Sequence, residues 1–172
     1  SFDYGQRHRK ELNFAAACAK RLGANHEIAD LSSINQLLAG SSLTSDEIEV
    51  PDGHYAEESM KATVVPNRNA IMISVAGGLA VSRGADRVAV GVHGGDHFIY
   101  PDCRPGFIDA MNLALSLGND EFAPAGFGLI APFIDVSKTE IARIGDALGV
   151  PWAETWSCYK GGDLHCGTCG TC

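Results

Sequence analysis

Apolar residues along the chain follow the spacing of helices in some stretches and that of strands in others. The pattern predicts helices over 9–22, 69–83 and 105–117. Short runs rich in Val, Ile and Leu, bounded by polar or glycine residues, predict strands instead. These strands are expected at 26–31, 87–92 and 129–133.

The helix expected over 69–83 is apolar on nearly all sides. Its run of Ile, Met, Val, Leu and Ala leaves little polar surface, which predicts burial on most sides. Gly77 and Gly78 lie near its middle. Since glycine has no Cβ, we expect a neighbouring element to approach the helix closely at this pair.

A fourth helix is predicted to begin after Ser137, because Ser137 and Glu140 have the spacing of a capping box. Gly149 is expected to end this helix, and Pro151 prevents its continuation. Its buried stripe is predicted to consist of Ile141, Ile144 and Leu148.

The segment 43–65 is polar and contains Pro51 and Gly53, which predicts a long loop. Loops of this length inside compact domains are usually functional or mobile. Outside it, strands alternate with helices. This alternation predicts an α/β protein with βαβ units and a parallel sheet.

Bulk composition is that of one ordinary globular domain. The chain has 172 residues, of which 45% are hydrophobic and 20% charged, with a formal net charge of −8. It has no apolar run long enough to cross a membrane and no basic-then-apolar leader, so a cytoplasmic location is expected. The negative charge argues against direct binding of nucleic acid, because phosphate contacts need clustered Lys and Arg.

Four of the six cysteines lie in the last fifteen residues, with the spacing C-x7-C-x2-C-x2-C. Four thiolates complete a tetrahedral zinc site, and the two-residue spacers let neighbouring cysteines bind one ion. A redox thiol pair and an iron–sulfur cluster are the alternatives. With no coordination position left for water or substrate, the zinc is expected to be structural. The expected ligands are Cys158, Cys166, Cys169 and Cys172.

Three polar segments follow the predicted strands, where ligands bind in open parallel sheets. They are residues 3–8, 65–69 and 91–104, and each contains an arginine suited to phosphate or carboxylate: Arg7, Arg68 and Arg104. Gly94 and Gly95 allow backbone amides to approach an anion. Metal binding by His93 and His97 is a weaker alternative, and Asn69 is open to a purely structural interpretation as a helix cap.

Two carboxylates in the third segment, Asp96 and Asp102, could accept paired N–H donors such as a guanine-like base presents. Taken alone, the residues indicate an α/β enzyme that handles an anion, such as a nucleotide, and carries a separate zinc staple.

Five separated motifs resemble the 7-cyano-7-deazaguanine synthase family of the PP-loop ATP pyrophosphatases. They occur in the family's order through essentially the whole chain, and together they are highly specific. The motifs are Phe2-Asp3-Tyr4-Gly5-Gln6-Arg7-His8, Val65-Pro66-Asn67-Arg68-Asn69, Tyr100-Pro101-Asp102-Cys103-Arg104, Thr155-Trp156-Ser157-Cys158-Tyr159 and the closing Cys-x-x-Cys-x-x-Cys.

The resemblance implies an ATP-dependent ligase that forms C–N bonds in queuosine or archaeosine biosynthesis. It converts 7-carboxy-7-deazaguanine and ammonia to the nitrile, using ATP with Mg²⁺, and is expected to be a homodimer. The implied fold is a Rossmann-like parallel sheet with flanking helices, of the adenine nucleotide alpha hydrolase type. We expect a nucleotide-binding domain over 1–154 and a zinc-binding segment over 155–172.

The resemblance also implies which residues contact the ligands. The catalytic residues are not assigned by it. The residues expected to bind ATP are Tyr4, Arg7, Arg68, Asn69, Gly94 and Gly95. Those expected to bind the deazaguanine are Asp96, Tyr100, Asp102 and Arg104.

One motif of the family has no counterpart in these residues: the Ser-Gly-Gly-x-Asp-Ser loop that follows the family's first strand and binds ATP phosphates. We therefore expect the 172 residues alone to be inactive and poorly stable. Alternatives from the sequence are a tRNA-thiolating relative with an iron–sulfur cluster, a non-catalytic zinc-ribbon module, and a paralogue that modifies DNA bases.

Overall fold

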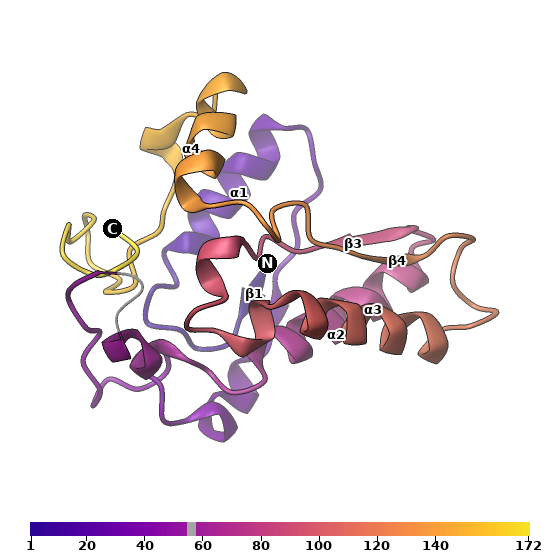
Figure 1. The fold of residues 1–172 in the computed structure, drawn as a ribbon, viewed down its shortest axis with the longest axis horizontal. Coiled ribbons are helices and arrows are strands. Elements are labelled where there is room, and N and C mark those ends of the chain that lie inside the picture. Colours follow the sequence, from indigo (N-terminus) through magenta and orange to yellow (C-terminus); the bar gives the residue numbers. More distant parts are fainter. Residues whose placement is uncertain (55–57) are drawn as a thin grey trace. The chain divides into compact units, whose positions relative to one another are not determined.

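A computed structural model describes residues 1–54 and 58–172, which form two compact units (Figure 1). The terminal unit consists of Ser1–Pro66 and Gly149–Cys172, and the central unit of Asn67–Leu148. Both ends of the chain therefore belong to the same unit.

The terminal unit contains a short βαβ arrangement. Strand β1 (Phe2–Asp3) pairs in parallel with β2 (Ala29–Asp30), and helix α1 (Glu11–Arg21) connects them. The described residues of this unit also form the 3₁₀ helices Ser32–Leu38, Glu58–Thr63 and Trp152–Glu154. Gly23 follows α1 with φ +64°, a left-handed conformation that suits glycine and ends the helix where the sequence predicted.

The central unit is built around a second parallel pair, β3 (Arg87–Ala89) with β4 (Gly128–Ile130). Val88 faces Leu129 in this register, and both side chains are buried. The remaining elements of this unit are helices α2 (Arg68–Ser82), α3 (Pro105–Gly118) and α4 (Lys138–Ala147), with 3₁₀ helices Gly94–Asp96 and Pro101–Cys103.

The parallel strands and intervening helices confirm the α/β prediction, and all four predicted helices are present. Strands β2 and β3 lie inside their predicted ranges, and β4 begins one residue before the range predicted for it. All of the strands are only two or three residues long, and β1 was not predicted. Among the described residues, no helix is both long enough and apolar enough to cross a membrane.

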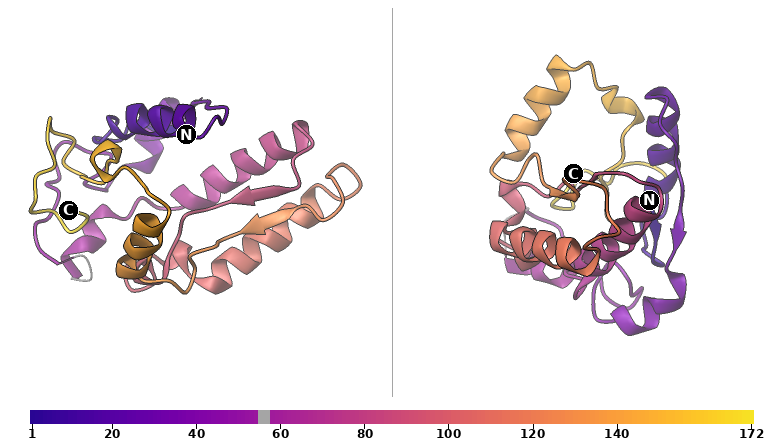
Figure 2. Two further views of the ribbon diagram at one scale, coloured as in Figure 1. Left: turned by 90° about the horizontal axis from the view of Figure 1, so that it is seen from above. Right: turned by 90° about the vertical axis from the view of Figure 1, so that its right-hand side faces the viewer.

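Close packing of α2 on α3 occurs at Gly77, as the sequence predicted. A Cβ built at Gly77 would lie 2.5 Å from Cδ2 of Leu115, whereas one at Gly78 would meet nothing within 4 Å. Figure 2 shows the two helices running alongside β3 and β4. The missing Cβ of Gly77 therefore makes room for a buried leucine of the facing helix.

Two burial predictions are wrong. Helix α2 buries Ile73, Gly77 and Ala80, but Val75 and Leu79 on its other side are exposed. Of the buried stripe predicted for the fourth helix, Ile144 on α4 is 37% exposed and Leu148, which caps the helix, is 77% exposed. An apolar pattern identifies the face of a helix that favours burial, but it does not supply an element that covers it.

The loop prediction for 43–65 is correct only in part. The segment contains the 3₁₀ helix Glu58–Thr63, and Leu43, Met60 and Thr63 are fully buried. Residues 55–57 of the predicted loop lie outside the described residues. The buried side chains show that parts of this segment belong to the core of the terminal unit.

The glycine pair of α2 provides a test of this packing. Ala in place of Gly78 is expected to stabilise the helix by about 1 kcal/mol, because alanine has the higher helix propensity. Ala in place of Gly77 is expected to be less stable than Gly78→Ala by about 1–3 kcal/mol, because Leu115 must move. Denaturant unfolding followed by circular dichroism measures both. Equal effects at the two positions would contradict the close approach.

Candidate functional site

The four cysteines predicted as metal ligands converge in the terminal unit. Their sulfur atoms all lie within 4.8 Å of one another. Cys172 Sγ lies 3.7 Å from Cys166 Sγ and 3.5 Å from Cys169 Sγ. Tetrahedral zinc with Zn–S bonds of about 2.3 Å separates its sulfurs by roughly 3.8 Å, so this donor set fits such an ion. The cluster could therefore hold a metal ion.

Backbone amides prepare one of these sulfurs to act as a ligand. Cys166 Sγ accepts hydrogen bonds from the N–H groups of Thr168 (3.4 Å) and Cys169 (3.2 Å). Desolvation is the largest influence on its pKa and raises it, but these amides and the Thr168 hydroxyl together lower the pKa of Cys166 to about 5. A thiolate forms readily at this position, and thiolates are the species that bind metals.

The opposite shift at Cys172 reflects the crowding of four sulfurs. Burial, and then the neighbouring cysteines, raise the pKa of Cys172 to about 12. A divalent cation would displace the protons of such thiols, because only the thiolate is a ligand. Metal binding and proton release are therefore coupled at this cluster.

Aromatic side chains connect the cysteine segment to helix α1. The ring of Trp156 lies 5.3 Å from that of Phe14 and 4.4 Å from that of His165. Its indole N–H donates to the Cys158 carbonyl at 3.0 Å, and Lys10 Nζ lies 4.9 Å from its ring centroid. Trp156 thus packs on α1 while its polar edge holds the first cysteine.

The same segment also packs on the turn that follows β1. The rings of Tyr159 and His8 lie 5.2 Å apart, and Lys10 Nζ donates to the Asp163 carbonyl at 2.6 Å. Gly161 has φ +70°, and a Cβ there would lie only 2.5 Å from the Arg7 carbonyl oxygen. The metal-binding segment and the Arg7–His8 turn are therefore in direct contact.

Arg7, predicted to bind ATP, is held by the loop that follows residue 42. Its backbone N–H donates to Leu43 O at 3.0 Å, and its Nη2 donates to Ser45 O (2.8 Å) and Ile48 O (3.2 Å). Asp46 lies 3.6 Å from the same nitrogen. The guanidinium therefore already organises a protein loop, and an anion would have to bind its remaining N–H groups.

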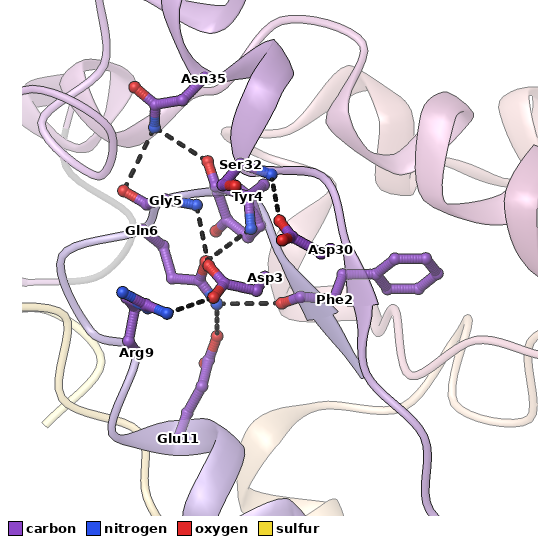
Figure 3. Close-up of polar contacts among 10 residues, drawn as sticks. All are labelled: Phe2, Asp3, Tyr4, Gly5, Gln6, Arg9, Glu11, Asp30, Ser32 and Asn35. Atoms are coloured by element: carbon purple, nitrogen blue, oxygen red, sulfur yellow. Dashed lines mark hydrogen bonds and ion pairs between the residues drawn. The ribbon is translucent and has the colours of Figure 1, made fainter.

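Tyr4, also predicted to bind ATP, is buried beside a network of polar side chains (Figure 3). Asn35 Nδ2 donates to the carbonyls of Tyr4 (2.8 Å) and Gly5 (3.2 Å). The Gln6 amide accepts from Tyr4 N at 2.9 Å and donates to Phe2 O at 3.1 Å. The turn after β1 is thereby fixed by side chains that sequence reasoning did not single out.

In the central unit, Arg68 and Asn69 begin helix α2. The N-cap is Asn67, with φ +56°, so the interpretation of Asn69 as the cap is wrong. Instead, Asn69 N donates to Asp102 Oδ2, and Asn69 Nδ2 donates to the Asp102 carbonyl, both at 3.4 Å. The structure thus brings together Asn69 and Asp102, which were predicted to bind different ligands.

Gly94 and Gly95, predicted to approach phosphate, donate their amides to protein acceptors. Gly94 N bonds to Val136 O at 2.9 Å, and Gly95 N bonds to His93 Nδ1 at 3.1 Å. Asp96 is buried, and its carboxylate accepts from His93 N at 3.3 Å. Burial lowers the pKa of His93, which favours the neutral ring, and only a neutral ring can accept the hydrogen bond from Gly95 N at Nδ1. A phosphate would have to displace these hydrogen bonds.

The remaining two predicted substrate residues lie close to Asp96 in the chain. Tyr100 is buried and its N–H donates to Asp96 O at 2.9 Å, while the exposed Arg104 donates from Nε to His97 O at 2.9 Å. Cys103 lies between these two residues in the chain, and burial raises its pKa to about 12. This thiol is consequently unsuited to act as a nucleophile.

The structure therefore divides the predicted site residues between its two units. The terminal unit holds Tyr4, Arg7 and the four cysteines, and the central unit holds Arg68, Asn69, Gly94, Gly95, Asp96, Tyr100, Asp102 and Arg104. Sequence reasoning missed Asp52 and Lys160, which contact each other beside the cysteines. No local pattern could have paired residues 108 positions apart.

Comparison with known proteins identifies relatives over the full chain. Residues 1–172 match the family described as "Queuosine biosynthesis protein QueC". The 7-cyano-7-deazaguanine synthases of Rhizobium rhizogenes (strain K84 / ATCC BAA-868) and Rhizobium meliloti (strain 1021) are each 64% identical over 172 residues. That of Allorhizobium ampelinum (strain ATCC BAA-846 / DSM 112012 / S4) is 60% identical. Each match covers 100% of this chain and 72% of the relative. The resemblance predicted from the five motifs is thus confirmed.

The contact between Gly161 and Arg7 yields a prediction about stability. An alanine at either Gly161 or Gly23 must adopt a left-handed conformation, at a cost of roughly 1–2 kcal/mol. Only at Gly161 does the added Cβ also meet backbone, whereas at Gly23 it meets nothing within 4 Å. We expect Gly161→Ala to destabilise the metal-loaded protein by at least about 1 kcal/mol more than Gly23→Ala, as overpacking does. Thermal unfolding of both variants measures this, and equal losses would contradict the contact.

Proposed function

We propose, since this chain belongs to the QueC family, that it acts in queuosine biosynthesis as a 7-cyano-7-deazaguanine synthase, an ATP-dependent enzyme that forms a C–N bond. The observation that carries the proposal is the 60–64% identity, along the whole chain, to relatives with that name. The substrates are 7-carboxy-7-deazaguanine, ammonia and ATP.

The chemistry explains why ATP is required. A carboxylate is a poor electrophile, so ATP first converts it to an acyl adenylate with release of pyrophosphate. Ammonia then forms the C–N bond as AMP leaves and a proton is lost, which gives an amide. A second ATP adenylates the amide oxygen with release of pyrophosphate, and loss of AMP and of the two N–H protons then leaves the nitrile. Positive groups and Mg²⁺ balance the phosphate charge in these steps.

The ligand roles of individual residues are part of the proposal. Arg7 and Arg68 suit the phosphates of ATP, because the guanidinium donates several hydrogen bonds and stays charged. Supporting a role for the third segment, Asp96 is buried and Asp102 contacts the start of α2. The full sets are Tyr4, Arg7, Arg68, Asn69, Gly94 and Gly95 for ATP, and Asp96, Tyr100, Asp102 and Arg104 for the deazaguanine.

The metal of the cysteine cluster is proposed to be zinc with a structural role. Four thiolate ligands close the coordination shell, so the ion cannot bind water or substrate. The ligands would be Cys158, Cys166, Cys169 and Cys172. When bound, the ion would fix the segment that packs on the Arg7–His8 turn, whereas the reacting groups lie elsewhere.

The finer features of the fold are likewise proposed. The parallel pairs β1–β2 and β3–β4 support a Rossmann-like sheet of the adenine nucleotide alpha hydrolase type. The division into a nucleotide-binding domain over 1–154 and a zinc-binding segment over 155–172 remains a prediction, as does the homodimer.

The direct test is incubation of the full-length protein with 7-carboxy-7-deazaguanine, ATP, Mg²⁺ and ammonium. Mass spectrometry should detect the nitrile, accompanied by AMP and pyrophosphate. Replacing Asp102 with Asn removes a charged acceptor, which should lower kcat/KM for the deazaguanine by about tenfold to a hundredfold.

Asp109→Asn serves as the matched control, because Asp109 is an exposed carboxylate on α3. It should retain the activity of the unmodified protein. If a metal-loaded protein formed no nitrile, the proposed function would be wrong. An unchanged kcat/KM in Asp102→Asn would remove that residue from the substrate site.

A further inference from the structure

A lysine lies beside the cysteine cluster without being one of its ligands. Lys160 Nζ donates to Asp52 Oδ1 at 2.5 Å and to Thr168 Oγ1 at 3.2 Å. Thr168 in turn contacts Cys166 Sγ through its hydroxyl, at 3.6 Å, and through its backbone N–H. A chain of hydrogen bonds therefore joins the ammonium group of Lys160 to one of the sulfurs.

Charge explains why a cation belongs at this position. A divalent ion with four thiolates carries a net charge of −2, since +2 and −4 sum to −2. The chain as a whole carries −8. The ammonium group of Lys160 attracts this negative charge, and its side chain is only 33% exposed. Partial burial reduces solvent screening of this attraction.

We propose that Lys160 is the charge-balancing partner of the metal centre, held in place by Asp52 and Thr168, and that it strengthens metal binding without contacting the ion. Residues beyond the ligands commonly tune metal sites in this way. This inference rests on the proposed zinc site and does not depend on the reaction.

Asp52 holds Lys160 through its carboxylate, and its backbone pairs with the cysteine segment. Residues 52 and 169 form an antiparallel bridge, and Gly53 N donates to Thr168 O at 3.1 Å. This pairing places the Asp52 carboxylate where it can hold the ammonium group. Since Asp52 is itself negative, its removal has two opposing effects on the metal centre: Lys160 loses its anchor, but a repulsive charge is also lost.

The test measures zinc affinity of the full-length protein by competition with a chromophoric chelator. Lys160→Met should weaken zinc binding by about 10–100-fold, the range typical of outer-shell changes. Lys160→Arg, which keeps the charge, should retain most of the zinc affinity. Asp52→Asn should lose less zinc affinity than Lys160→Met does. Lys160→Gln keeps a hydrogen-bond donor but has no charge, so it should lose as much zinc affinity as Lys160→Met. It serves in place of Lys160→Met if that variant fails to fold.

Lys61→Met is the matched control, because Lys61 pairs with Glu58 in the same unit and should leave zinc affinity unchanged. Raising the salt concentration should reduce the difference in zinc affinity between Lys160→Met and the unmodified protein, because salt screens a charge effect but not a packing effect. Visible spectra of the Co²⁺ forms should show the same tetrahedral thiolate site in all variants.

Two results would overturn the proposal: Lys160→Gln that binds zinc as tightly as the unmodified protein, or Asp52→Asn that reproduces the whole loss. The second would mean that the ion pair acts only as a scaffold. An unmodified protein that binds no zinc would instead refute the proposed metal site, and nitrile formation is measured separately.

Discussion

The convergence of four cysteine sulfurs is the constraint on which much of the terminal unit depends. A segment rich in glycine and short of apolar side chains has little hydrophobic surface to hold it in place. Here its sulfurs lie within 4.8 Å of one another, and the flanking rings of Trp156 and Tyr159 pack on α1 and on His8. A metal ion at the sulfurs would supply the binding energy that this segment cannot obtain by burial.

The cysteine segment also contacts the Arg7–His8 turn. Arg7 contacts Gly161 of the cysteine segment on one side and, through its N–H and guanidinium, the loop around residues 43–48 on the other. Residues 52 and 53 also pair with residues 168 and 169 of the cysteine segment. The loop over residues 43–53 is therefore attached to the cysteine segment at two places, through Arg7 and through this pairing. A metal ion bound at the cluster would therefore order residues near the N-terminus.

Local rules predicted the helices of this protein well, because caps and helix-ending residues act over a few positions. Ser137 accepts from Glu140 N, and Gly149 has φ +70°, as the sequence indicated. The convergence of the four cysteines was also predictable, since two-residue spacers let neighbouring sulfurs approach one another. Long-range features were not: Arg7 bonds to Ser45 and Ile48, and Lys160 bonds to Asp52, across separations that no periodic pattern encodes. The buried stripe predicted for the fourth helix was wrong for a related reason, because an apolar face is buried only where another element covers it.

Hydrogen–deuterium exchange at the Arg7 amide reports directly whether a bound metal ion holds the Arg7–His8 turn. This N–H donates to Leu43 O at 3.0 Å, so it should exchange slowly in the zinc-loaded protein. After removal of the metal, exchange at Arg7 and over residues 43–48 should accelerate strongly relative to that of helix α3. Unchanged protection of the Arg7 amide in the metal-free protein would mean that the metal does not hold this turn.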